Sequence, residues 1–404
     1  MDTLNYILCA FLIAMNLGAI VYYKKNAYIH FYYMLLHFPI VTLQVLYIVI
    51  FQEHYFFGLH SVEPNLLMYA ITFINIKILT IISFSVLSPR SAKLNYDKKI
   101  YFQVNKTRSA FLLFLSLSLI LMLIFGFLGL DAVMNNTRPA VKSGSMIFII
   151  VIFSLIYPSL LNFYYQNHFN IYDIINILVT TFTLALLSKM HALAIVINLL
   201  IIFSSRQKKV SRIKIIILWL FIFSVFMYLQ IAKDTADINY YNNIKLLLRL
   251  IYEFGNESFL GLYSAVSTQH LGQDSHGINY GIYPLINGIL KLIPSALRPD
   301  LYGDLIYFDR GFDLRQSIVA SLDEEFYRAF HLVGAFLHGI VISIILMNAN
   351  HTLNRGLINP LAFTTLMLIP FMIRGPSVVV INHYLFMLIL TNILNYLFVR
   401  GSRN

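Results

Sequence analysis

The chain has 404 residues, of which 59% are hydrophobic and only 12% are charged, and its mean hydropathy is +0.73. Several apolar runs are too long for the core helices of a soluble domain, so this composition excludes a soluble globular protein and indicates a polytopic membrane protein. The net charge of +11 comes from short basic segments between apolar runs, which is the positive-inside pattern, and no nucleic acid is expected as a partner. A single cysteine, Cys9, excludes an intramolecular disulfide.

Eleven apolar segments follow one another along the chain. We expect each to cross the bilayer as an α-helix, because every backbone polar group has to be satisfied within lipid. The N-terminal residues before the first segment include no basic region, and no cleavage site follows, so the segment is expected to be an anchor and not a signal peptide. The fold class is therefore all-α, a polytopic integral membrane protein of about eleven transmembrane helices, at 4–23, 29–50, 66–87, 110–130, 146–165, 171–187, 190–204, 215–232, 329–347, 358–373 and 377–398.

The basic clusters orient these spans. With the N-terminus outside, Lys24, the run 90–108 and the run 206–214 all become cytoplasmic, as the positive-inside rule requires. A second interpretation, in which 186–196 belongs to one long broken helix, would invert everything downstream, but the basic run at 206–214 argues against it. Three regions result: transmembrane helices 1–8 in 1–232, a large periplasmic loop in 233–328, and transmembrane helices 9–11 in 329–404.

The external loop 233–328 is the first place to look for function. It holds twelve of the eighteen Asp and Glu residues of the chain. Its part 240–266 is apolar at helical spacing, and 280–303 is interrupted by three prolines, which predicts short helices at the interface. Long external segments that keep such a pattern commonly carry binding or catalysis.

A stripe of ionisable residues leads from this loop into the next span. A continuous helix beginning near Ser321 would place one polar face along the helix, since successive residues turn by 100°. Ionisable groups in a membrane helix normally face a bundle interior or a wet cavity. The alternative is an interfacial helix start with solvated charges above a structural pair of histidines. The residues of the stripe are Ser321, Glu324, Arg328, His331 and His338.

Basic residues predicted on the same outer face point to an anionic ligand. The guanidinium fork suits phosphate, and a pyrophosphate could engage two or three such groups. Taken one by one, each could also be a surface charge or a side chain that snorkels to the interface. The set comprises Lys189, Arg249, Arg298, Arg310, Arg315, Arg328 and Arg374.

Several motifs are absent from the sequence. It contains no Walker motif, no HExxH and no CxxC, and its twelve histidines lack ligand-like spacing, so neither a metal nor another cofactor is expected. Lys77 lies within the third predicted span, either on an ion path or as a satisfied structural lysine near the inner interface, and the second interpretation is favoured.

Three stretches and the order of spans resemble the Wzy polymerases of bacterial O-antigen. "LLSKMHALAIVINLL" (186–200) is similar to a short span of that family, and "YGIYPLINGILKLIPSALRP" (280–299) resembles its external loop. "SLDEEFYRAFHLVGAFLHG" (321–339) is similar to the family's Ser, then Glu-x-Tyr-x-Asn-Phe-Gly, then Gly. Ser321, Glu325, Tyr327, Phe330 and Gly334 match, while Ala329 and His331 stand where the family has Asn and Gly.

The resemblance implies a metal-independent glycosyltransferase of the C-type class in the bacterial inner membrane, with its active site on the periplasmic face. Its donor would be a growing glycan on undecaprenyl pyrophosphate, and its acceptor a lipid-linked repeat unit. A chain-length regulator protein is a further partner to expect. The general base would be Glu324, Glu325 or His331, and Tyr280, Tyr283 and Tyr327 would stack on sugars or anchor at the interface.

Other functions remain open at this point. A ligase that hands a finished glycan to another acceptor would share the fold and the cations. A flippase for the same lipid-linked sugars would distribute its charges through many spans, whereas here they concentrate in one external segment and its flanks. An O-acyltransferase would need a partnered histidine near the first spans, where His30 and His37 have no partner evident in the sequence.

Overall fold

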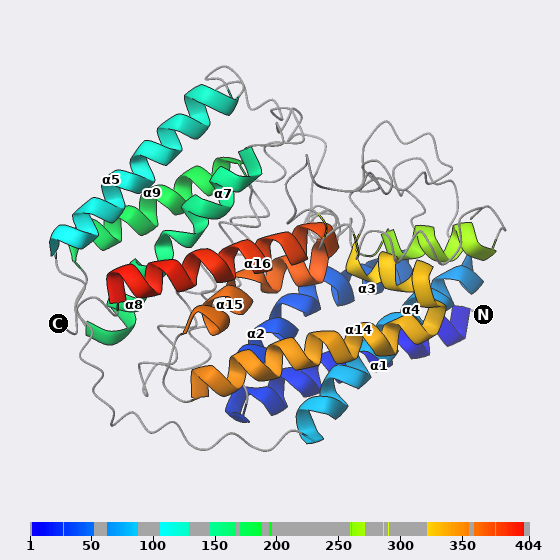
Figure 1. Cartoon of the computed structure of the whole chain (residues 1–404). Coiled ribbons are helices and arrows are strands. Elements are labelled where there is room, and N and C mark those ends of the chain that lie inside the picture. Colours follow the sequence, from blue (N-terminus) through cyan, green and yellow to red (C-terminus); the bar gives the residue numbers. More distant parts are fainter. Residues whose placement is uncertain are drawn as a thin grey trace. The chain divides into compact units, whose positions relative to one another are not determined.

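The computed structural model of the chain describes residues 2–26, 28–51, 63–87, 106–128, 145–166, 170–187, 194–195, 259, 261–270, 286, 290, 321–354, 359–375 and 377–399. These residues form helices, and no β-strand occurs among them (Figure 1). The N-terminal helices are α1 (Asp2–Asn26), α2 (Tyr28–His37), the π-helical turn η1 (Phe38–Thr42), α3 (Leu43–Phe51) and α4 (Pro64–Leu87). The central ones are α5 (Lys106–Met122), η2 (Leu123–Leu128), α7 (Ser145–Ser154), α8 (Ile156–Gln166) and α9 (Ile171–Leu187). The last are α14 (Leu322–Asn354), α15 (Pro360–Arg374), α16 (Ser377–Leu394) and η5 (Asn395–Val399).

Six described helical stretches are long and apolar enough to cross a bilayer, which is consistent with a helical membrane protein. Large apolar side chains lie on the outer surface of these helices, as lipid contact requires: Val21 is 70% exposed and Phe114 69%. The predicted spans 190–204 and 215–232 lie outside the described residues, apart from Ala194 and Ile195, so the total of eleven stays a prediction. The six stretches are Thr3–Tyr23, Ile29–Ile50, Pro64–Val86, Lys106–Gly126, Leu322–Thr352 and Val379–Phe398.

The chain divides into two compact units. Unit 1 comprises Met1–Ser91, Met227–His351 and Ile369–Asn382, and unit 2 comprises Ala92–Phe226, Thr352–Leu368 and His383–Asn404. In unit 2, polar side chains join neighbouring helices: Asn162 of α8 donates to Asp173 of α9 at 2.5 Å, and Asn176 donates to Ser159 at 3.1 Å. The division into 1–232, 233–328 and 329–404 that the sequence predicts remains a prediction.

In unit 1, α1 and α4 run in parallel. Asn5 near the start of α1 donates from Nδ2 to the carbonyl of Pro64 at the start of α4 (3.0 Å). Tyr23 and Ser85, near the other ends of the same helices, share a hydrogen bond between their hydroxyls. Two spans separated by one other span should run in the same direction, so this pairing agrees with the predicted order of crossings.

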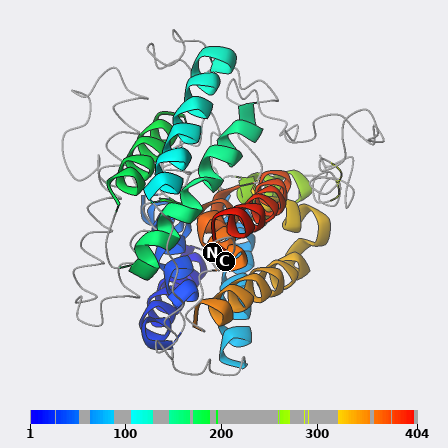
Figure 2. The same cartoon turned by 60° about the vertical axis from the view of Figure 1, so that its left-hand side comes forward.

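Helix α14 is sharply bent at His331. Its backbone there (φ 50°, ψ −138°) is not helical, so the element consists of a short leg, 322–330, and a long leg, 332–354. The two legs double back on each other, as both views show (Figures 1 and 2). The ring of Phe326 in the short leg stacks on His338 in the long leg, with centroids 4.7 Å apart and planes 6° apart. The expectation of one continuous polar stripe from Ser321 to His338 is therefore wrong, because the bend puts its two ends on separate legs.

Gly334 allows the two legs to approach each other. A Cβ at this position would overlap the carbonyl oxygen of Phe326. Because that neighbour is backbone in a buried helix, it cannot move aside without shifting the whole short leg.

We therefore predict that Gly334→Ala destabilises the protein by about 1–3 kcal/mol, the usual cost of overpacking a core. The measurement is thermal unfolding of the purified protein in detergent. Gly18→Ala is the matched control, because a Cβ at Gly18 of α1 would meet nothing within 4 Å. Equal midpoints for the two variants would contradict the close approach at Gly334.

Candidate functional site

Three consecutive carboxylates lie at the buried end of the short leg of α14. Asp323, Glu324 and Glu325 are 3%, 0% and 1% exposed. Charges inside a membrane protein are costly unless they are paired or hydrogen-bonded, and here each carboxylate has a partner from a different direction. All of these contacts lie within unit 1.

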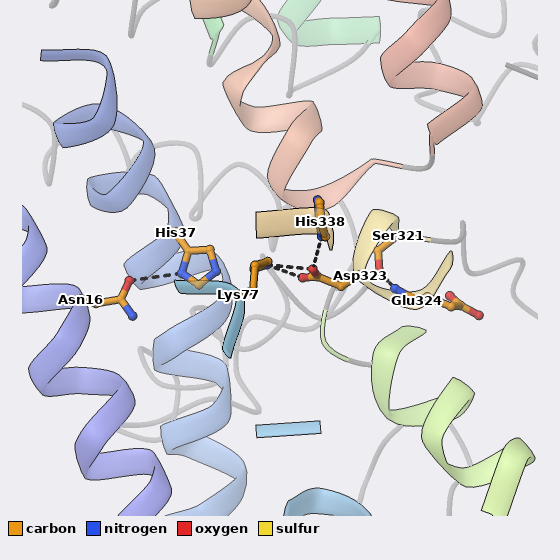
Figure 3. Close-up of polar contacts among 7 residues, drawn as sticks. All are labelled: Asn16, His37, Lys77, Ser321, Asp323, Glu324 and His338. Atoms are coloured by element: carbon orange, nitrogen blue, oxygen red, sulfur yellow. Dashed lines mark hydrogen bonds and ion pairs between the residues drawn. The ribbon is translucent and has the colours of Figure 1, made fainter. Parts of the chain in front are cut away.

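Asp323 is bound by two basic side chains. Lys77 of α4 donates to both of its carboxylate oxygens, at 2.6 and 2.8 Å, and Nδ1 of His338 in the long leg lies 2.9 Å from Oδ1 (Figure 3). Lys77 is 1% exposed and lies in the middle of its helix, thirteen residues from Pro64 and ten from Leu87. It is thus a satisfied lysine, as expected, but in the middle of the span and not near the inner interface.

Glu324 forms the predicted i, i+4 pair with Arg328, whose Nε donates to Oε1 at 3.2 Å. The backbone N–H of Glu324 donates to Oγ of Ser321 at 3.2 Å, so Ser321 caps the short leg. A Cβ at Gly261 would collide with the Glu324 carboxylate, so glycine lets that carboxylate lie directly against the helical segment 261–270.

Glu325 is held by the N-terminus of α16. Ser377, the first residue of α16, donates its N–H to the two carboxylate oxygens at 3.0 and 3.2 Å. A helix N-terminus carries partial positive charge and unpaired N–H groups, so it is a suitable partner for a carboxylate. The neighbouring N–H of Leu322 donates to the carbonyl of Gly375 at 3.0 Å, which ties the short leg to the connection between α15 and α16. Arg374 ends α15 beside this connection.

The segment 261–270, part of the predicted external loop, packs against the same leg. Gln269 donates from Nε2 to the carbonyl of Arg328 (3.1 Å), and the hydroxyl of Tyr263 accepts the N–H of Glu63 just before α4 (2.9 Å). Burial raises the pKa of Tyr263 to about 12, so this phenol stays protonated. Residues that the predicted topology assigns to the outer face therefore contact one another.

The other described residues of the expected site differ from one another. Tyr327 is 2% exposed and its ring packs edge-on against Phe73, with centroids 5.7 Å apart, so it is a core residue in this conformation and not an open sugar platform. His331 is exposed at the bend. Among the described residues its ring contact is with Tyr327, edge-on, with the two ring centroids 5.9 Å apart. Seven expected site residues lie outside the described part of the chain: Lys189, Arg249, Tyr280, Tyr283, Arg298, Arg310 and Arg315.

One signal in the sequence does point to the buried ion pair. A lone lysine inside an apolar span needs an acidic partner, and the run 323–325 is the densest group of acidic residues next to a span.

His37, which has no evident partner in the sequence, contacts Asn16 of α1 through Nδ1 at 3.2 Å. Among the described residues, no group of three or more His, Cys, Asp or Glu side chains could hold a metal ion.

Fold and site together define a helical membrane protein with a buried cluster of acidic and basic groups at the tip of a doubled-back helix. Comparison with family models, with curated proteins and with solved structures finds no match.

His331 adopts a backbone conformation that favours glycine, and we predict that His331→Gly stabilises the protein by about 1 kcal/mol. The measurement is the unfolding midpoint in detergent. His351→Gly is the control, because His351 is an exposed histidine with ordinary helical backbone in the long leg, and glycine should destabilise there. A lower midpoint for His331→Gly would mean that the imidazole matters more than the backbone.

Ser377→Pro removes the N–H that holds Glu325, yet proline is well tolerated at the first position of a helix. We expect a loss of about 1–3 kcal/mol, because a buried carboxylate loses its donor. Ser377→Ala keeps the N–H and serves as the control, with a smaller loss of stability than Ser377→Pro. If both variants unfold alike, the contact with Glu325 does not contribute to stability.

Proposed function

We propose that this protein is a repeat-unit polysaccharide polymerase of the bacterial inner membrane. It transfers a growing glycan from undecaprenyl pyrophosphate onto the non-reducing-end sugar of a lipid-linked repeat unit. The observation that carries the proposal is the short leg of α14: the stretch 321–339, which resembles the Wzy polymerases, is also where buried carboxylates and a guanidinium are brought together against the external segment 261–270.

The backbone at His331 supports the same proposal. The family pattern has glycine at this position, and here the residue has a positive φ of 50°, which glycine adopts without strain. A sharp turn at the entry to the span is a physical reason for the family's glycine. His331 is accordingly assigned no catalytic role, because it is exposed on the bend and makes no hydrogen bond with a described residue.

The proposed reaction needs a base and a cationic environment. The bond between the anomeric carbon and the pyrophosphate oxygen breaks, a bond to the acceptor oxygen forms, and the proton of the acceptor hydroxyl passes to a carboxylate. Negative charge develops on the pyrophosphate, which arginine and lysine stabilise without a metal. Arg328 and Arg374 are described members of that cationic set, and Arg374 lies at the end of α15 beside the connection that holds the short leg.

Among the three carboxylates we assign the base to Glu325. The charge of Asp323 is offset by Lys77, and that of Glu324 is offset by Arg328. Among the described residues, the Glu325 carboxylate is hydrogen-bonded to Ser377 and is not paired with a cation, so it is the carboxylate most available to accept a proton. Glu324 then orients Arg328.

The test uses the purified protein in liposomes that contain undecaprenyl-pyrophosphate repeat units, with a chelator present and product lengths read by mass spectrometry. We expect a regular ladder for the wild type. In Glu325→Gln the rate of ladder formation should fall by about 10²–10⁴-fold, the usual contribution of a general base. Glu324→Gln should lower the rate mainly through the loss of an oriented Arg328.

Asp173→Asn is the matched control, since it neutralises another buried carboxylate, in unit 2, and should leave the ladder unchanged. A single transfer without a ladder would indicate a ligase. Movement of the lipid-linked sugar between leaflets without transfer would indicate a flippase, and either result would overturn the polymerase.

A further inference from the structure

The pair of Lys77 and Asp323 has no role in the reaction just proposed, although both of its side chains are buried. Both oxygens of Asp323 accept from Nζ of Lys77, at 2.6 and 2.8 Å, and the side chains are 1% and 3% exposed. Removing two charges from water costs about as much as their attraction returns, so such a pair adds little net stability. Its presence therefore needs another explanation, and ionisable groups in membrane helices usually have a functional one.

The pair joins α4 to the short leg of α14. Lys77 lies thirteen residues into α4, about 20 Å along the helix axis. Asp323 is the second residue of the short leg, and His338 of the long leg contacts it from another side, at 2.9 Å. Figure 3 shows Lys77 and His338 meeting at Asp323, with His37 of α2 beside Lys77 and held in its orientation by Asn16.

The contacts of Lys77 and His338 with Asp323, here called the clamp, determine the rotation of the short leg. Successive residues of a helix point about 100° apart, so fixing the direction of Asp323 also fixes the directions of Glu324 and Glu325. Apolar contacts tolerate small rotations and shifts along the helix, whereas an ion pair with hydrogen bonds has a narrow geometry.

We propose that Lys77 and His338 are positioning residues: by clamping Asp323 they set Glu324 and Glu325 in their productive orientation. The effect on turnover rests on the proposed function. The effect of the clamp on the order of the short leg can be tested without that function.

The central variant is Lys77→Met with Asp323→Leu, which replaces the pair by apolar side chains of similar size. Because no charge is left unpaired, we expect the unfolding midpoint to fall only slightly, through the hydrogen bond that His338 loses with Asp323. Turnover should fall by about 100-fold with little change in KM, since misplacement of the carboxylates by about 1 Å costs that much. Hydrogen exchange of the backbone amides in 322–330, measured by mass spectrometry, should become faster.

A charge exchange, Lys77→Asp with Asp323→Lys, restores an ion pair of the same total length and should recover part of the turnover and of the exchange protection. Asn75→Leu is the matched control: it lies on the same helix, donates to the carbonyl of Leu8 at 3.1 Å and is not part of the clamp, so exchange in 322–330 and turnover should stay unchanged. His338→Gln removes one side of the clamp without leaving a charge unpaired. It gives a second test, with faster exchange and lower turnover expected.

Wild-type exchange and turnover in both the apolar double variant and His338→Gln would overturn the clamp. If the wild-type protein makes no ladder, the proposed function fails, and the exchange data alone still decide whether the clamp orders the short leg. If the ladder forms but exchange and turnover do not respond to loss of the clamp, the positioning role fails and the polymerase stands.

Discussion

The organisation of unit 1 depends on how charge is accommodated inside an apolar helical bundle. Hydrocarbon offers no water to an ionised side chain, so a lysine in the middle of α4 is tolerated only if an anion comes to it. Asp323 does so from the tip of the short leg of α14, and His338 completes the contact. The neighbouring carboxylates are carried into the bundle with it and require partners of their own. Arg328 and the N-terminus of α16 supply them.

The bend at His331 makes this arrangement possible. A straight helix would carry residues 322–330 away from the long leg and out of their contacts with it. A change of direction at one residue instead returns the short leg alongside the long leg, and Gly334 provides the space for the contact with Phe326. The acidic residues are thereby buried among helices, although they belong in sequence to a hydrophilic segment.

The same geometry distributes three adjacent carboxylates among three environments. Asp323 faces a lysine and a histidine, Glu324 an arginine, and Glu325 a helix N-terminus. Adjacent residues on a helix point in different directions, so a run of identical charges can serve different purposes. In the proposed polymerase this separates anchoring, orientation of a cation and proton transfer.

The sequence by itself determined the class of the protein and the positions of most described helices, since apolar length and the satisfaction of backbone hydrogen bonds are local properties. The boundaries of α4 and α9 lie within two residues of the spans that the sequence predicts. It also located the charged stretch of the site and the pair of Glu324 and Arg328, which depends only on helical spacing.

Only the tertiary structure decided the bend at His331, the partner of Lys77 and the burial of Tyr327. Each of these depends on which segments meet in space. Lys77 and Asp323 are 246 positions apart in the chain, and no local pattern links them. The helical spacing of polar and apolar residues continues through 321–338 and hides the bend, because a positive φ at one residue leaves no trace in such a pattern. The contacts of Gly334 and His338 with Phe326 belong to the packing of the two legs.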